Sequence, residues 1–240
     1  MCFTVNLDLT RKELENRFGA KFRDPGSYHS SYYLNAFDLP LLPVIRTEDP
    51  EIIDLVSWGL IPFWVKDSKA ASKIRLKTFN AREETILEKP SFRTAVQSKR
   101  CLVLVRGFYE WQHREKEKIP YFIYLKDEQP LAMAGIYDDW TDQEIGEWQQ
   151  SCSVITTAAN NLMERIHNNK KRMPVILNRN SERAWIDPGI SAKEAVKHLC
   201  PVDESEMKAH TISKLISKRG VNKNVPELVT PYSYEQDRFW

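Results

Sequence analysis

The chain has 240 residues, of which 42% are hydrophobic and 28% are charged, and its formal net charge is +2. This balance is typical of a soluble globular protein, and the nearly neutral charge means that any nucleic-acid binding has to come from a local patch. No stretch reaches the roughly 18 apolar residues of a membrane-spanning helix, and the start Met1-Cys2-Phe3-Thr4 lacks the pattern of a signal peptide. We therefore expect a cytoplasmic protein.

The first part of the chain predicts short elements of both kinds. Residues 10–18 predict a helix capped by Thr10, with Glu13 in the capping-box position. Residues 40–49 predict a loop and then a strand, and residues 52–60 predict a strand that ends at Trp58-Gly59. The basic stretch from Lys66 to Lys77 predicts a surface loop, and residues 80–97 predict two short helical segments separated at Pro90.

The second part predicts a series of strands followed by helices. Apolar runs separated by turn residues predict strands at 101–111, 121–126, 131–138, 148–157 and 173–178, with a helical turn at 160–167. Helices are expected at 181–187, with Ser181 as cap, and at 191–200, and the tail from Gly220 predicts loop with a possible strand. We expect an α+β fold, a single domain over 1–240 built on an antiparallel β-barrel-like sheet with flanking short helices. Its motifs would occupy about 2–200, and 201–240 would form a C-terminal extension.

The four cysteines do not suggest a metal site. None forms a CxxC pair, and Cys101 and Cys152 lie in apolar runs where a free cysteine behaves as a small hydrophobic residue. We expect no metal and no small-molecule cofactor. Disulfides are not expected in a cytoplasmic chain.

Cys2 differs, because removal of Met1 would give it a free α-amine beside its thiol. Such an amine titrates near 7.7–8.0, so about a tenth is an unprotonated nucleophile at pH 7. It can form a Schiff base with an aldehyde, and the thiol can then close a thiazolidine ring. An aldehyde is therefore the natural reaction partner, although Cys2 taken alone is more simply explained as a small residue entering a strand.

Other candidate residues each allow a structural interpretation as well. Glu110 follows an apolar run, so burial could suit it to acid–base chemistry, or it could pair with a nearby cation. His167 could shuttle protons or cap a helix, and Asn80 could orient a sugar or begin a helix. Arg82 can bind a phosphate, and Trp64 lies beside the basic stretch as in single-strand channels, or packs in the core.

Taken together and in this order, these segments resemble the SRAP family, the SOS response-associated peptidases or abasic-site-processing proteins. The matching segments are Met1-Cys2, Trp58-Gly59-Leu60-Ile61-Pro62-Phe63-Trp64, Asn80-Ala81-Arg82 with Glu84, Arg100-Cys101-Leu102-Val103, Gly107-Phe108-Tyr109-Glu110-Trp111, Ile155-Thr156-Thr157-Ala158-Ala159-Asn160, and His167 with Arg172-Met173-Pro174.

The resemblance implies an enzyme that links covalently to an abasic site in single-stranded DNA. Cys2 would be the nucleophile, Glu110 the acid and base, Asn80 the residue that orients amine and sugar, and His167 an aid to ring opening and reversal. The DNA path would be lined by Trp64, Arg82, Thr156 and Arg172. The peptidase name would reduce to removal of Met1, and the lyase-like enzyme would act at the nucleoid during the DNA damage response. The modest net charge and the single-domain organisation favour a monomer.

Two departures from the family pattern leave other functions open. The common start is Met-Cys-Gly-Arg, whereas this chain has Phe3-Thr4, and four residues, 168–171, separate His167 from Arg172 where the common form has one. A non-catalytic single-stranded nucleic-acid-binding module would bind intact and abasic strands equally. An N-terminal cysteine amidohydrolase would release ammonia from glutamine.

Overall fold

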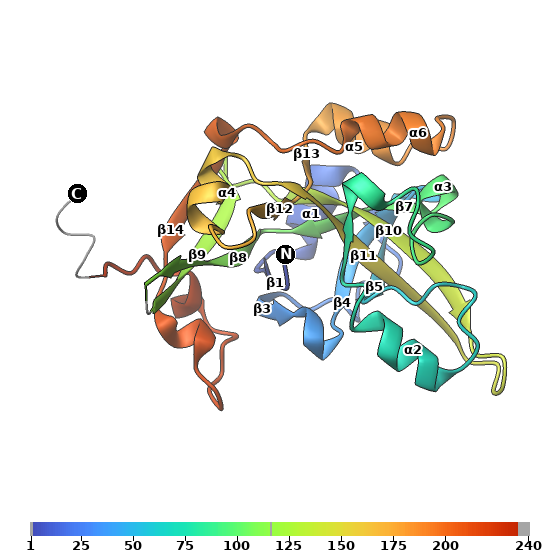
Figure 1. Ribbon diagram of the computed structural model, residues 1–240, viewed down its shortest axis with the longest axis horizontal. Coiled ribbons are helices and arrows are strands. Elements are labelled where there is room, and N and C mark those ends of the chain that lie inside the picture. The colour runs from blue at the N-terminus through green and yellow to red at the C-terminus, as the bar shows by residue number, and fades with distance from the viewer. Residues whose placement is uncertain (1, 116, 235–240) are drawn as a thin grey trace.

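The computed structural model describes residues 2–115 and 117–234. Its centre is a closed barrel of five strands, shown on the right of Figure 1. Antiparallel pairs join the strands in the order β11-β10-β7-β4-β5, and a short parallel pairing of β5 with β11 closes the ring. The strands are β4 (Leu41–Arg46), β5 (Asp49–Trp58), β7 (Arg100–Val105), β10 (Leu131–Thr141) and β11 (Trp148–Ala158).

A second antiparallel sheet extends from the barrel, because the chain leaves β7 at Arg106 and continues directly into β8. Its order is β14-β9-β8-β1-β3, and Figure 1 shows β8 and β9 reaching to the left, with β1 in the middle of the molecule. The strands are β1 (Thr4–Leu7), β3 (Ser31–Asn35), β8 (Gly107–Arg114), β9 (Glu117–Leu125) and β14 (Met207–Thr211). The N-terminal strand is thereby held beside Glu110's strand.

Short elements complete the two sheets. The minor strands are β2 (Lys21–Phe22), β6 (Asn80–Arg82), β12 (Arg172–Pro174) and β13 (Ile176–Leu177). The α-helices are α1 (Arg11–Phe18), α2 (Ser68–Arg75), α3 (Ala95–Ser98), α4 (Asn161–Ile166), α5 (Arg179–Trp185) and α6 (Ala192–Ala195). Single 3₁₀ turns lie at Ala36–Asp38, Glu83–Thr85, Val196–His198, Glu204–Glu206, Lys214–Ser217 and Pro226–Val229. None of the helices in the described ranges is long and apolar enough to cross a membrane.

The structure confirms the α+β class and the antiparallel, barrel-like sheet. It also confirms the first helix, whose Thr10 side chain accepts a hydrogen bond from the Glu13 backbone while the Glu13 carboxylate accepts from the Thr10 backbone. Cys101 and Cys152 lie in strands and are buried, as predicted for small hydrophobic residues.

The basic stretch from Lys66 to Lys77 was wrongly predicted as a loop, because it contains α2. The Asp67 carboxylate caps this helix by accepting a hydrogen bond from the Ala70 amide. Ala71 and Ile74 form its apolar face and pack in a small cluster with Trp140. The many lysines of the segment hid this narrow apolar face.

Several smaller predictions were also wrong. Asn80 does not cap a helix but begins β6, which pairs in parallel with β11, and Asn178 rather than Ser181 caps α5. The predicted single strand at 101–111 is two strands separated at Arg106. The described residues after Gly220 form the expected loop, with a 3₁₀ turn at Pro226–Val229 and a bridge from Pro231 to Ile212. Strand β14 was not predicted.

Candidate active site

Cys2 lies two residues before the start of β1 and is completely buried, in the same core cluster as Trp58, Phe79 and Ile166. Burial, and then the negative charge of Glu110, raise the pKa of its thiol well above the ordinary value. The thiol is therefore uncharged at neutral pH, and an attack on an electrophile by a preformed thiolate is not favoured. The unprotonated α-amine that removal of Met1 would expose is the more available nucleophile.

Asn80 holds the backbone of Cys2 in place. The Asn80 Nδ2 donates a hydrogen bond of 2.9 Å to the Cys2 carbonyl, across 78 residues of sequence. The parallel pairing of β6 with β11 sets Asn80 opposite Val154 and so fixes its position. Its Oδ1 is buried and has no hydrogen-bond partner among the described residues. It can therefore accept a hydrogen bond from an amine or a sugar hydroxyl.

Glu110 is a buried carboxyl group, with 5% of its surface exposed. It lies on β8 opposite Tyr121 of β9, in the middle of the second sheet. Burial raises the pKa of Glu110 to about 8, although a hydrogen bond from the Trp111 backbone opposes the shift. Most of this carboxyl is therefore protonated at pH 7 and can donate a proton.

His167 faces Glu110 from the C-terminal end of α4. Its Nε2 lies 3.7 Å from the Glu110 Oε2, and its Nδ1 lies 2.7 Å from the Arg172 carbonyl oxygen. A carbonyl can only accept, so Nδ1 carries the proton and Nε2 presents its lone pair toward Glu110. Burial lowers the pKa of His167, which favours this neutral form.

The pair therefore combines a protonated acid with a neutral base at neutral pH. Glu110 lies on β8 and His167 at the C-terminal end of α4. Glu110 is near the Cys2 thiol, because its ionised form raises the pKa of that thiol, and His167 lies 3.7 Å from Glu110. A carboxyl group with a raised pKa beside a histidine with a lowered pKa is typical of acid–base sites. The four residues that the sequence predicted as catalytic are brought together.

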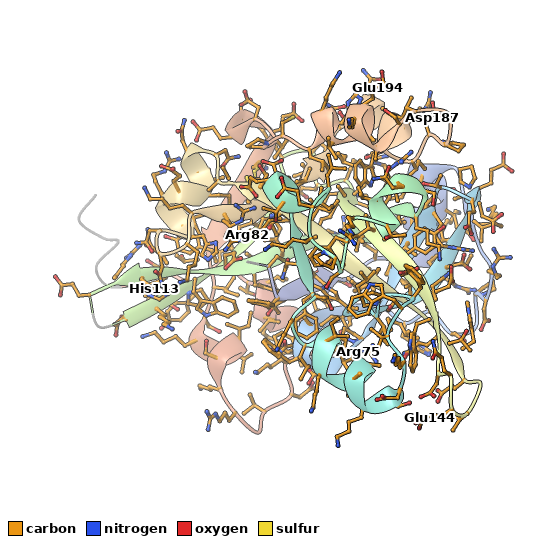
Figure 2. The ribbon with its side chains drawn as sticks, turned by 45° about the vertical axis from the view of Figure 1, so that its right-hand side comes forward. Arg75, Arg82, His113, Glu144, Asp187 and Glu194 are labelled. Carbon is orange, nitrogen blue, oxygen red and sulfur yellow. The ribbon has the colours of Figure 1, made fainter. Side chains whose placement is uncertain are left out.

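The residues predicted to line a DNA path divide into two groups. Trp64 has 44% of its surface exposed, and its ring nitrogen donates to the Pro90 carbonyl at 3.3 Å. Arg82, labelled in Figure 2, is exposed at the end of β6, where it is paired with Thr156 of β11, and its side chain makes no ion pair or hydrogen bond with the described part of the chain. Both side chains are open to a ligand.

Arg172 and Thr156 are engaged within the protein instead. Arg172 Nη1 and Nη2 pair with the two Glu84 carboxylate oxygens at 2.6 and 3.0 Å. Its Nη2 also donates to the Thr156 carbonyl at 2.7 Å, and Thr156 is fully buried. Their part in DNA binding stays a prediction, since a phosphate would have to compete with Glu84.

Sequence reasoning missed an aromatic surface beside Cys2. Phe37 has 57% of its surface exposed, and its ring packs 5.4 Å from Phe3 and 5.1 Å from Phe79. Phe3 stands where the common family pattern has glycine. No local signal marked Phe37, because only the pairing of β1 with β3 brings residues 3 and 37 together.

Comparisons with known proteins identify the family of the chain. The model of the family described as SOS response associated peptidase (SRAP) matches residues 1–219. Abasic site processing protein YoqW of Bacillus subtilis is 39% identical over 211 residues, which cover 87% of this chain and 89% of that protein. Abasic site processing protein HMCES of Xenopus tropicalis is 34% identical over 73% of this chain and 56% of that protein.

Solved structures show the same architecture. A crystal structure of a protein from Bacteroides thetaiotaomicron matches 97% of this chain and 100% of that one with a TM-score of 0.90 and 38% identity. A second, from Bordetella bronchiseptica, matches with a TM-score of 0.76 and 25% identity over 88% of this chain. With a family match over nearly the whole length and a relative above one-third identity, the chain belongs to the SOS response associated peptidase (SRAP) family.

Proposed function

We propose that this protein processes abasic sites in single-stranded DNA by forming a covalent adduct through Cys2 after Met1 is removed. The observation that carries the proposal is the convergence of Cys2, Asn80, Glu110 and His167, with the Cys2 carbonyl held by Asn80 and the Glu110 and His167 side chains 3.7 Å apart. The relatives named abasic site processing proteins support the choice of substrate. An abasic site is an aldehyde once its sugar ring opens, and an N-terminal cysteine traps aldehydes.

The reaction begins with opening of the sugar ring. The protonated Glu110 donates a proton to the ring oxygen, while His167 Nε2 accepts the proton of the anomeric hydroxyl, which leaves an aldehyde. The Cys2 amine then attacks the aldehyde carbon, and the oxygen departs as water to give a Schiff base. The thiol adds across the carbon–nitrogen double bond, with sulfur bonding to carbon and the proton passing to nitrogen, which closes a thiazolidine.

The DNA would pass over the exposed aromatic and basic side chains near the site. Arg82 would neutralise a phosphate, and Trp64 and Phe37 would stack on bases flanking the abasic nucleotide. The protein would act as a monomer, and the peptidase activity of the family name would be the removal of Met1. These exposed side chains equally suit a binding module without chemistry, which is the second candidate function.

A denaturing gel separates the two candidates. The purified protein, shown by mass to lack Met1, is incubated with a single-stranded oligonucleotide that carries one abasic site. We expect a slowly migrating band that disappears with Cys2→Ala and with an intact oligonucleotide. Equal binding of both oligonucleotides without any such band would favour the binding module.

A further inference from the structure

Strand β8 loses its neighbour just before the catalytic carboxyl. Strand β1 pairs with β8 at Gly107 and Phe108, and among the described residues no further strand pairs along that edge of β8. At His113, labelled on the β8–β9 hairpin in Figure 2, the side chain of Asn168 occupies this edge. The His113 amide donates to Asn168 Oδ1 at 3.0 Å, and Asn168 Nδ2 donates to the His113 carbonyl at 2.9 Å. The carboxamide thus replaces the peptide group of a missing strand.

A second contact joins the same two segments. Gln112 Nε2 donates a hydrogen bond of 2.8 Å to the Arg165 carbonyl in the last turn of α4. Because side chains alternate along a strand, Gln112 projects from the same face of β8 as Glu110. His167 is therefore bracketed in sequence by two contacts to β8, one at residue 165 and one at residue 168.

The loop that carries Asn168 has a defined backbone. The Lys171 amide donates to the His167 carbonyl at 2.8 Å, and the Ala159 amide donates to the Lys171 carbonyl at 3.1 Å. Lys171 has a φ of 49°, in the left-handed region that side-chain-bearing residues rarely adopt. The turn directs the chain so that the Arg172 carbonyl reaches His167 Nδ1. Lys170 and Lys171, which belong to the loop that is longer than in the common family pattern, are therefore part of a closed turn that starts at His167.

We propose that Asn168 is a positioning residue that holds His167 at its working distance from Glu110, with Gln112 as the second contact. Asn168 is exposed and touches neither Cys2 nor Glu110, so its effect passes through the backbone on either side of His167. The consequence for reaction rate depends on the proposed function, whereas the placement of His167 can be measured without DNA.

The first test follows the titration of His167 by NMR in the free protein, with the resonance assigned from His167→Ala. Asn168→Ala is compared with Asn169→Ala, a matched control because Asn169 is an exposed neighbour with no side-chain hydrogen bond to the described residues. Burial lowers the pKa of His167 and is the largest cause, the hydrogen bond to the Arg172 carbonyl raises it, and the charges of His113 and Lys170 lower it. Since burial is the largest cause, release of the loop should raise the pKa of His167 toward its ordinary value in Asn168→Ala but not in Asn169→Ala. An unchanged titration in Asn168→Ala would overturn the proposal.

The second test measures the rate of adduct formation with the abasic oligonucleotide. A displacement of a catalytic group by about 1 Å can slow a reaction by up to about 100-fold, so we expect a clear loss in Asn168→Ala and wild-type rates in Asn169→Ala. In a His167→Ala background, Asn168→Ala should cause no further loss. An equal further loss would show that Asn168 does not act through His167.

A third variant and a stability measurement complete the design. Gln112→Ala removes the second contact and should raise the pKa of His167 in the same direction, which keeps the proposal testable if Asn168→Ala does not fold. Thermal unfolding establishes which variants are folded. If the wild type forms no adduct at all, the proposed function fails, but the NMR comparison still decides whether Asn168 positions His167.

Discussion

Replacement of Glu110 by glutamine tests the electrostatics of the site most sharply. Burial raises the pKa of Glu110 from 4.5 to about 8 in the folded protein. A shift of this size corresponds to about 5 kcal/mol between the protonated and ionised forms, which we take as an upper bound. Folding therefore favours the protonated carboxyl, and about 90% of it is protonated at pH 7.

The effect on stability has a definite sign. Between about pH 4.5 and pH 8 the folded protein holds the Glu110 proton while the unfolded chain has released it. The free energy of unfolding of the wild type should consequently fall as pH rises through this window. Glutamine does not titrate, so the free energy of unfolding of Glu110→Gln should not show this fall. The difference in stability between Glu110→Gln and the wild type should therefore shift in favour of the variant from pH 5 to pH 9.

Thermal unfolding at pH 5 and pH 9 measures the effect. For a chain of this length, a few kcal/mol corresponds to a shift in Tm on the order of 10 °C, so the gap between Glu110→Gln and wild type should widen by about that much at pH 9. Glu88→Gln, at an exposed carboxyl, is the control and should leave the gap unchanged. A gap for Glu110→Gln that is equal at both pH values would refute the burial argument. In the adduct assay, the same variant should lose about 10²–10⁴-fold in rate as the proton donor disappears.

Other predictions concern the frame of the site and the DNA surface. Gly107→Ala should lower the free energy of unfolding by about 1–3 kcal/mol, since its new methyl would meet the Ile123 carbonyl and the Phe122 ring. Gly26→Ala, in an open turn, is the control and should not lower it. Denaturant titration measures both variants, and equal stabilities would show that the backbone relaxes around the new methyl. Arg82→Ala should weaken binding of an intact single strand and reduce the slope of log affinity against log salt by about 0.7, and an unaltered slope would remove Arg82 from the DNA path. Phe37→Ala should weaken single-strand binding by about 1–3 kcal/mol in a fluorescence titration, and wild-type affinity would contradict its stacking role.

Features encoded by neighbouring residues were predictable from the sequence. The capping box of Thr10 and Glu13 depends on positions three residues apart, and the alternating apolar runs depend on adjacent positions, so both could be found locally. The burial of Glu110 was partly foreseen because it follows a strongly apolar strand. The candidate catalytic residues were predicted from their motifs and from the family resemblance, not from any expected proximity in the fold.

Features decided by distant pairing were not predictable in this way. Asn80 has the local pattern of a helix cap, but pairing of β6 with β11 and the hydrogen bond to Cys2 override it. Asn168 reads as an ordinary loop residue, because its partner at His113 is 55 residues away. The strand β14 is short and polar, so only its pairing with β9 makes it a strand.

The central claim is that the amine nitrogen and the thiol sulfur of Cys2 form the covalent bonds to the DNA sugar. Mass spectrometry of the adduct tests this claim most directly. Protein lacking Met1 is reacted with the abasic oligonucleotide, weighed intact, and digested to locate the modified peptide. We predict a mass equal to protein plus DNA minus one water, carried by the peptide that begins at Cys2, and resistant to borohydride because a thiazolidine has no double bond to reduce. An adduct on a lysine, or one of equal yield in Cys2→Ala, would contradict the account.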